Sequence, residues 1–148
     1  MGNYLRLHIH LIWSTKHRRP YLTAEIRRRL FPYLAATLRG QRGGLRAIGG
    51  WVDHVHLYAE FPSYLSVGQL VSVLKSRSCR WLRMVFPQTT PFRWQRGYAA
   101  FSVDPRHSER LIRYIHSQEQ HHSRTPYLEE FTAIVESYGL DAADDPGD

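Results

Sequence analysis

The chain has 148 residues, enough for one compact domain, and its 43% hydrophobic and 22% charged residues exclude a largely disordered or fibrous protein. No apolar run is long enough to span a bilayer, no secretory signal is visible, and the single cysteine, Cys79, excludes an internal disulfide, so we expect a cytoplasmic protein. Basic residues exceed acidic ones by 20 to 13, and four of the acids lie in residues 141–148, so residues 1–140 carry a formal charge of +11, which favours a polyanionic partner.

The first predicted element is a strand over Tyr4–Trp13, where apolar and polar residues alternate. The alternation places His8 and His10 together on the polar face of this strand, while the apolar residues share the other face. Thr23 is a suitable N-cap for a helix that runs to about residue 38, because apolar residues then recur at four-residue spacing.

A β-hairpin is predicted next, with strands over Leu45–Ile48 and Val52–Glu60 on either side of a glycine turn at residues 49–50. Ser66 and Gln69 have the spacing of a capping box, in which each side chain accepts a hydrogen bond from the other residue's backbone. They predict a second helix that runs to about residue 85.

The elements after residue 90 are shorter. Strand-like segments lie at Phe92–Trp94 and Tyr98–Val103. Asp104 as the N-cap and Pro105 as the first helical residue predict a third helix over about Arg106–His121.

This order of elements predicts an α+β fold, a ferredoxin-like or RRM-like antiparallel sheet with helices on one face. A C-terminal helix carrying Tyr114 is added to it, and a weaker helix is expected over Leu128–Tyr138. In this topology the first and third strands are neighbours. We expect one domain over residues 1–140 and an acidic, disordered tail over residues 141–148.

Two histidines in the third strand are the first candidates for chemistry. His54 and His56 are separated by one residue, so their side chains share a face about 6.5–7 Å apart and can converge on one metal ion. The pattern is weak alone, because His8 and His10 repeat it and most such histidines are exposed or hydrogen-bonded. A histidine-triad hydrolase would need a third histidine, but Tyr58 stands at that position.

The third helix supplies a second group. Tyr114 and Gln118 are four residues apart and therefore lie on one helical face, while the apolar stripe that includes Ile115 faces the core. A tyrosine on the polar side of a helix more often only directs its hydroxyl towards water. The spacing alone leaves both interpretations open.

Five sequence blocks change that balance, because they follow the order seen in one known family. They are HLIWSTKHRRPYL from His10, DHVHLY (Asp53–Tyr58), LKSRSCRWL (Leu74–Leu82), WQRGYAAFSV (Trp94–Val103) and YIHSQEQHH (Tyr114–His122). Over residues 4–138 the chain resembles the single-tyrosine HUH transposases of the TnpA type, an IS200-like family that includes the REP-associated tyrosine transposases.

The resemblance implies a function and a site. His54, His56 and Gln118 would bind a divalent ion, Mg²⁺ or Mn²⁺, and the nitrogen ligands make Mn²⁺ the better chemical match. Tyr114 would attack the phosphorus of single-stranded DNA to give a 5′-phosphotyrosine and a free 3′-hydroxyl, and the reverse attack by another 3′-hydroxyl would rejoin the strands. No further cofactor is expected.

The resemblance also implies partners: single-stranded DNA with a hairpin structure, and a second copy of the chain in a homodimer whose tyrosine helices can complete each other's sites. The protein would then associate with the nucleoid. One of His8 and His10 is expected to touch the scissile phosphate or to orient a metal ligand. The alternative is a non-catalytic or domesticated protein that binds single strands through its basic and aromatic residues. The candidate DNA contacts are Lys16, Arg18, Arg19, Lys75, Arg77, Arg80 and Arg83.

Overall fold

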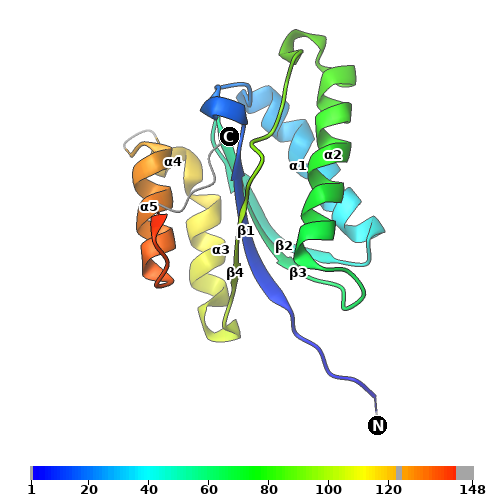
Figure 1. Ribbon diagram of the computed structural model, residues 1–148, viewed down its shortest axis with the longest axis vertical. Helices are drawn as coiled ribbons and strands as arrows, with labels where there is room; N and C mark the ends of the chain where they lie inside the picture. The colour runs from blue at the N-terminus through cyan, green and yellow to red at the C-terminus, as the bar shows by residue number, and fades with distance from the viewer. Residues whose placement is uncertain (1, 123–124, 143–148) are drawn as a thin grey trace.

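A four-stranded antiparallel sheet lies between two groups of helices in the computed structural model, which describes residues 2–122 and 125–142 (Figure 1). The strand order is β2-β3-β1-β4, so the first and third strands are neighbours and the predicted ferredoxin-like topology is confirmed. The register pairs Ser14 with His54 and Ile12 with His56. The strands are β1 (His8–Ser14), β2 (Gly44–Gly50), β3 (His54–Glu60) and β4 (Ala99–Ser102).

Helices α1 (Ala24–Gly40) and α2 (Val67–Val85) cover one face of the sheet. Both begin at the predicted caps: the Thr23 side chain accepts a hydrogen bond from the backbone of Ile26, and Ser66 and Gln69 form both bonds of the capping box. The main core lies between this helical pair and the apolar sides of β1 and β3. Its fully buried members include Leu11, Trp13, Leu30, Leu34, Val55, Leu57, Leu70 and Leu74.

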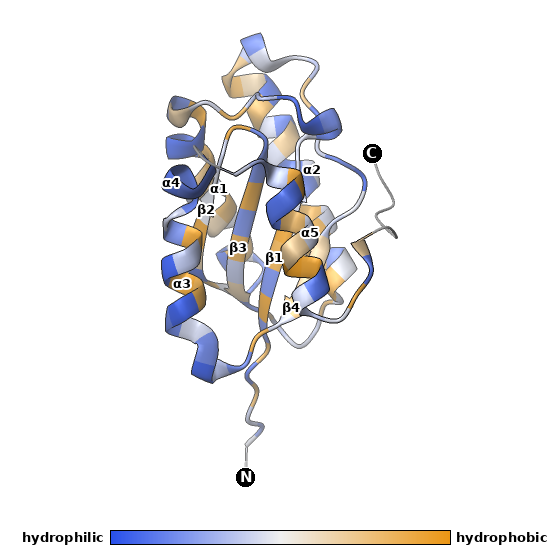
Figure 2. Ribbon diagram, turned by 90° about the vertical axis from the view of Figure 1, so that its left-hand side faces the viewer, coloured by the Kyte–Doolittle hydropathy of each residue, from blue (hydrophilic) through white to orange (hydrophobic). Residues whose placement is uncertain are grey.

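Three later helices cover the other face: α3 (Ser108–His116), α4 (Gln118–His122) and α5 (Tyr127–Ser137). The α3 helix packs over β2 and β3 through Ile115, and α5 packs over β1 and β4 through Val135. Between α3 and α5 lies a strip of β3 and β1 (Figure 2). The face of β1 that carries His8 and His10 is buried, although both residues are polar.

A glycine allows α3 to lie directly against the sheet. A Cβ atom at Gly49 would stand only 2.1 Å from the backbone oxygen of Ile115, so any side chain there would push the tyrosine helix away. The predicted turn at residues 49–50 is therefore wrong: both glycines belong to β2, and the turn lies at residues 51–53.

Other element boundaries also differ from the prediction. Strand β1 begins at His8, and residues 2–7, which include Tyr4, are exposed. Segment 92–94 is not a strand; it forms one isolated bridge, Thr15 with Trp94, and its aromatic rings fill the core instead. Strand β4 is shorter than predicted, and residues 143–148 of the expected tail lie outside the described residues.

The predicted third helix is broken into three pieces. A 3₁₀ turn over Pro105–His107 precedes α3, and Ser117 separates α3 from α4. The Ser117 hydroxyl donates to the backbone oxygen of Tyr114 at 2.9 Å, and this local bond competes with regular helical bonding. None of the described helices is both long and apolar enough to cross a membrane.

Candidate metal and tyrosine site

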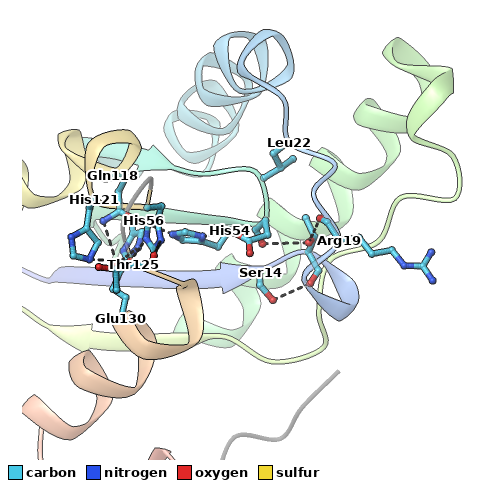
Figure 3. Close-up of polar contacts among 12 residues, drawn as sticks. Ser14, Arg19, Leu22, His54, His56, Gln118, His121, Thr125 and Glu130 are labelled. Atoms are coloured by element: carbon cyan, nitrogen blue, oxygen red, sulfur yellow. Dashed lines mark hydrogen bonds and ion pairs between the residues drawn. The ribbon is translucent and has the colours of Figure 1, made fainter.

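His54 and His56 project from β3 into the covered strip between α3 and α5, where both side chains are fully buried. Their ring centroids are 5.2 Å apart, as the alternation of the strand predicts. Gln118 and Glu130 lie close to His56 in the close-up, and His54 lies between this group and the loop that carries Arg19 (Figure 3). The sheet therefore sets the positions of the two imidazoles, and the C-terminal helices bring the other groups to them.

Hydrogen bonds fix the orientation of both rings. His54 Nδ1 lies 2.8 Å from a carboxylate oxygen of Asp53, so a neutral ring donates there and keeps a lone pair on Nε2. That Nε2 faces the amide oxygen of Gln118 at 3.0 Å. His56 Nδ1 lies 2.9 Å from His10 Nε2, which leaves the Nε2 atom of His56 facing away from β1.

Tyr114 and Gln118 meet at the site although they belong to different helices. The Tyr114 hydroxyl donates to Glu130 Oε1, and its ring lies 5.8 Å from the His56 ring of the same chain. Gln118 is almost completely buried and donates to the same Glu130 oxygen at 3.2 Å. The position of α4 is held by an ion pair of 2.9 Å between Glu119 and the buried Arg27 of α1.

Glu130 and His122 belong to the site but were not predicted. Glu130 Oε1 lies 3.1 Å from His56 Nε2, and Glu130 Oε2 contacts His122 Nε2. His122 Nδ1 lies 2.8 Å from the backbone oxygen of Thr125, so a neutral ring donates there and directs its Nε2 lone pair to the site. A signal was present in the sequence, because Glu130 interrupts the buried stripe of α5 between Tyr127 and Ile134.

Burial and charge decide which groups are ionised. Burial lowers the pKa of His10 to about 3 and that of His56 to about 4. Burial by itself raises the pKa of Glu130, but the close contact with His56, helped by Tyr114, outweighs it and lowers this pKa to about 2. Burial and then the bond to Glu130 raise the pKa of Tyr114 above its ordinary value. At neutral pH, neutral imidazoles at positions 10 and 56 therefore surround an ionised carboxylate and a protonated phenol.

The residues of this cluster fit a divalent cation. Within the described part of the chain, four buried side-chain polar atoms lack a hydrogen bond; one is Trp13 Nε1 in the core, and the other three lie in this cluster: His56 Nε2, His122 Nε2 and Glu130 Oε2. One ligand atom from each of these residues and from His54 fits within 4.8 Å of the others. Ligands about 2.1 Å from one octahedral ion are separated by about 3.0 Å when adjacent and about 4.2 Å when opposite. The cluster can therefore bind a metal ion, which would satisfy lone pairs that otherwise face one another.

The histidines of β1 take different places. His10 contacts the His56 ring directly, through its Nε2 atom. His8 lies outside the cluster, where its two ring nitrogens are 2.9 Å from the Tyr58 hydroxyl and from a Glu60 carboxylate oxygen. Of the predicted pair, only His10 is in position to orient a candidate metal ligand.

Three predicted DNA contacts, Lys16, Arg18 and Arg19, lie just after the end of β1. They follow Ser14, the residue that pairs with His54 in the sheet. Lys16 and Arg18 bound a 3₁₀ turn, and the Thr15 hydroxyl donates to the backbone oxygen of Arg19 at 2.6 Å. The Thr15 backbone amide donates to Asp53 at 2.8 Å, which ties this loop to the residue that orients His54. Lys16 and Arg19, together with Tyr21 and Arg93 among others, line a pocket of about 220 Å³.

The four predicted contacts on α2 differ from one another. Arg77 and Arg80 are exposed. Arg83 Nε donates to the backbone oxygen of Phe92 at 2.8 Å. The Lys75 ammonium donates to the backbone oxygens of residues 95 and 97 at 2.7 Å and of residue 96 at 3.3 Å, so it holds the segment before β4 against α2.

Lys75→Ala is expected to destabilise the protein by about 2 kcal/mol, because three backbone oxygens lose their shared donor. Arg80→Ala on the exposed side of the same helix is the matched control and should change stability by less than about 0.5 kcal/mol. Urea unfolding measures both effects. A Lys75→Ala protein of unchanged stability but weaker affinity for hairpin DNA would instead identify Lys75 as mainly a DNA contact.

Comparison with known proteins gives one consistent result. The family model described as "Transposase IS200 like" matches residues 3–118. The ISDra2 transposase TnpA of Deinococcus radiodurans is 28% identical over 124 residues, which cover 79% of this chain and 87% of that protein. His54, His56, Tyr114 and Gln118 all lie within the matched residues 3–118, whereas His122 and Glu130 lie beyond them.

Two solved structures share the architecture. A crystal structure of a predicted transposase from Deinococcus radiodurans R1 superposes with a TM-score of 0.66 at 27% identity, covering 80% of this chain and 95% of the other. A REP-associated tyrosine transposase bound to a REP hairpin gives a TM-score of 0.62 at 14% identity, covering 100% of this chain and 93% of the other. At that identity, the second likeness concerns the fold alone.

Proposed function

Because the chain belongs to the IS200-like transposase family, we propose that it cuts and rejoins single-stranded DNA at hairpin-flanked ends. Tyr114 is the nucleophile in this proposal, and His54, His56 and Gln118 hold a divalent metal ion. The observation that carries it is the position of Tyr114 at the buried cluster, where its ring lies 5.8 Å from the His56 ring and its hydroxyl donates to the carboxylate that Gln118 also contacts. A tyrosine on a solvated helical surface would not have these neighbours.

The proposed reaction exchanges one phosphodiester bond for another. The Tyr114 oxygen attacks the scissile phosphorus, the bond to the 3′-oxygen breaks, and a 5′-phosphotyrosine and a 3′-hydroxyl result. A bound Mg²⁺ or Mn²⁺ would polarise the phosphate and stabilise the leaving oxygen. Because the phosphotyrosine conserves the bond energy, a second 3′-hydroxyl can reverse the attack and join the strands. His10 would keep His56 oriented through their 2.9 Å contact.

The basic loop after β1 supports a path for the DNA backbone beside the site. Thr15 links this loop to Asp53, and Asp53 in turn contacts His54. We assign the pocket lined by Lys16, Arg19 and Arg93 to phosphates near the cleaved bond, since such contacts supply most of the affinity without reading sequence. The hairpin ligand of the REP-associated relative supports a hairpin substrate. The homodimer stays a proposal, as does association with the nucleoid.

End-labelled hairpin oligonucleotides with single-stranded 5′ or 3′ flanks test the function of the wild-type chain. With Mn²⁺ we expect a covalent protein–DNA adduct that survives denaturing electrophoresis, and EDTA should prevent it because the ion is needed for the attack. An oligonucleotide of the same composition without a hairpin is the control. Tight hairpin binding without any adduct, with either Mn²⁺ or Mg²⁺ present, would favour the non-catalytic alternative.

A further inference from the structure

We propose that Glu130 of α5, together with His122 of α4, supplies additional ligands to the metal ion, so that the ion is held by groups from β3, α4 and α5. This inference rests on the proposed function, because it concerns the same metal site. Both residues lie beyond the segment that the family model matches, so family membership assigns them no role.

The geometry around Glu130 is that of a ligand rather than of a surface carboxylate. Its side chain is 3% exposed, and its Oε1 atom lies 3.1 Å from His56 Nε2, close to the separation of adjacent ligands on one ion. Its Oε2 atom makes no hydrogen bond within the described residues; it faces the Nε2 lone pair of His122, and His121 Nε2 lies 3.7 Å from it. Two acceptors placed against each other repel, and a cation between them removes that repulsion.

Charge supports the same assignment. Three ligands are proposed within the family-matched segment: His54, His56 and Gln118. A metal-binding imidazole or amide carries no charge, so these ligands alone would leave the 2+ charge of the buried ion uncompensated. Burying a charge without an opposite charge beside it costs free energy, and this holds for the ion and for the Glu130 carboxylate alike. Glu130 is the carboxylate of the cluster, and its oxygens lie beside the atoms that would bind the ion. Asp53 is also close, but it contacts His54 at Nδ1, the ring nitrogen opposite the one that would bind the ion.

A carboxylate in this position also connects the ion to the nucleophile. Glu130 Oε1 accepts the hydrogen bond from the Tyr114 hydroxyl and another from Gln118, while it lies next to His56. An ion bound to this carboxylate therefore holds the phenol beside the metal through one shared group. Carboxylate oxygen together with imidazole nitrogen also suits Mn²⁺ better than nitrogen alone.

Mn²⁺ binding without DNA separates this inference from the proposed function. Isothermal titration with Mn²⁺ is expected to show binding to the wild-type protein and at least about tenfold weaker binding to Glu130→Gln, which keeps shape and hydrogen bonding but removes the charge. Glu129→Gln changes the exposed neighbour on the same helix and should bind Mn²⁺ like the wild type. With Co²⁺ as the probe, Glu130→Gln should also alter the visible absorption spectrum, because a ligand of the ion has changed.

The outcomes distinguish the two proposals. If the wild-type protein binds neither Mn²⁺ nor Co²⁺, the metal site of the proposed function fails as well. If the wild type binds and Glu130→Gln binds equally well or more tightly, only the role of Glu130 is overturned. Thermal unfolding in EDTA checks that the variant folds. His122→Gln, which keeps Glu130, is the second variant: it too should weaken Mn²⁺ binding about tenfold, and unchanged affinity would remove His122 from the ligand set.

Discussion

Tyr114→Phe is expected to abolish the covalent protein–DNA adduct while the protein stays folded and binds the hairpin. The substitution removes one oxygen atom, the one that would bond to phosphorus, and leaves the ring beside His56. The lost hydrogen bond to Glu130 should cost about 1 kcal/mol of stability, because Gln118 still donates to that carboxylate. Denaturing electrophoresis of labelled DNA measures the adduct, and urea unfolding measures the stability.

Tyr127→Phe is the matched control for this experiment. The Tyr127 ring stacks on His54 with a centroid distance of 4.4 Å, so it is a second tyrosine close to the candidate ligands. We expect this variant to form the adduct at nearly the wild-type level. An adduct that persists in Tyr114→Phe and disappears in Tyr127→Phe would transfer the nucleophile to α5.

The strand that carries the two histidines could be predicted because its pattern is local. Alternation alone places His54 and His56 on one face and Val55 on the other, and the structure buries the pair side by side. The caps at Thr23 and Ser66 were equally predictable, since a side-chain oxygen that accepts a backbone hydrogen bond three residues later is a local interaction.

The rest of the cluster depends on contacts that no local pattern specifies. Glu130 follows His56 by 74 residues in the sequence. It reaches His56 because α5 packs over β1 and β4. The break at Ser117 was missed because no Gly or Pro marks it, and it accompanies a local bond from the Ser117 hydroxyl to the backbone of Tyr114. The turn was placed two residues early because a Gly-Gly pair usually marks a turn, whereas Gly49 is needed for the close approach of α3.

The two sides of the sheet contribute differently to the site. The α1–α2 side is a conventional apolar core, and it fixes the strands that present His10, His54 and His56. The other side has only small apolar contacts under α3 and α5, and polar groups occupy the space between them. The Glu119–Arg27 ion pair links these two sides by holding α4 to α1. The positions of the tyrosine and of the proposed ligands on α4 and α5 therefore depend on the packing of the C-terminal helices against the sheet.

His56→Ala is expected to remove cleavage while leaving the affinity for a hairpin oligonucleotide within about threefold of the wild type, because phosphate contacts dominate binding. The imidazole is fully buried, so the cavity should cost about 1–3 kcal/mol of stability. His56→Asn keeps a polar group towards His10 and guards against loss of folding. Gel shift and cleavage assays are compared at one salt concentration. Loss of binding together with folding in both variants would make His56 a structural residue.

Mixing these variants determines which subunit supplies the tyrosine. Within one chain the Tyr114 ring lies 5.8 Å from the His56 ring, and in this arrangement each site takes both residues from the same chain. A mixture of Tyr114→Phe and His56→Asn proteins should therefore stay inactive, because every chain lacks one of the two. If the tyrosine helix is exchanged between subunits of a dimer, some mixed dimers regain a complete site and the adduct reappears. Recovery of the adduct would establish the exchange and the dimer together.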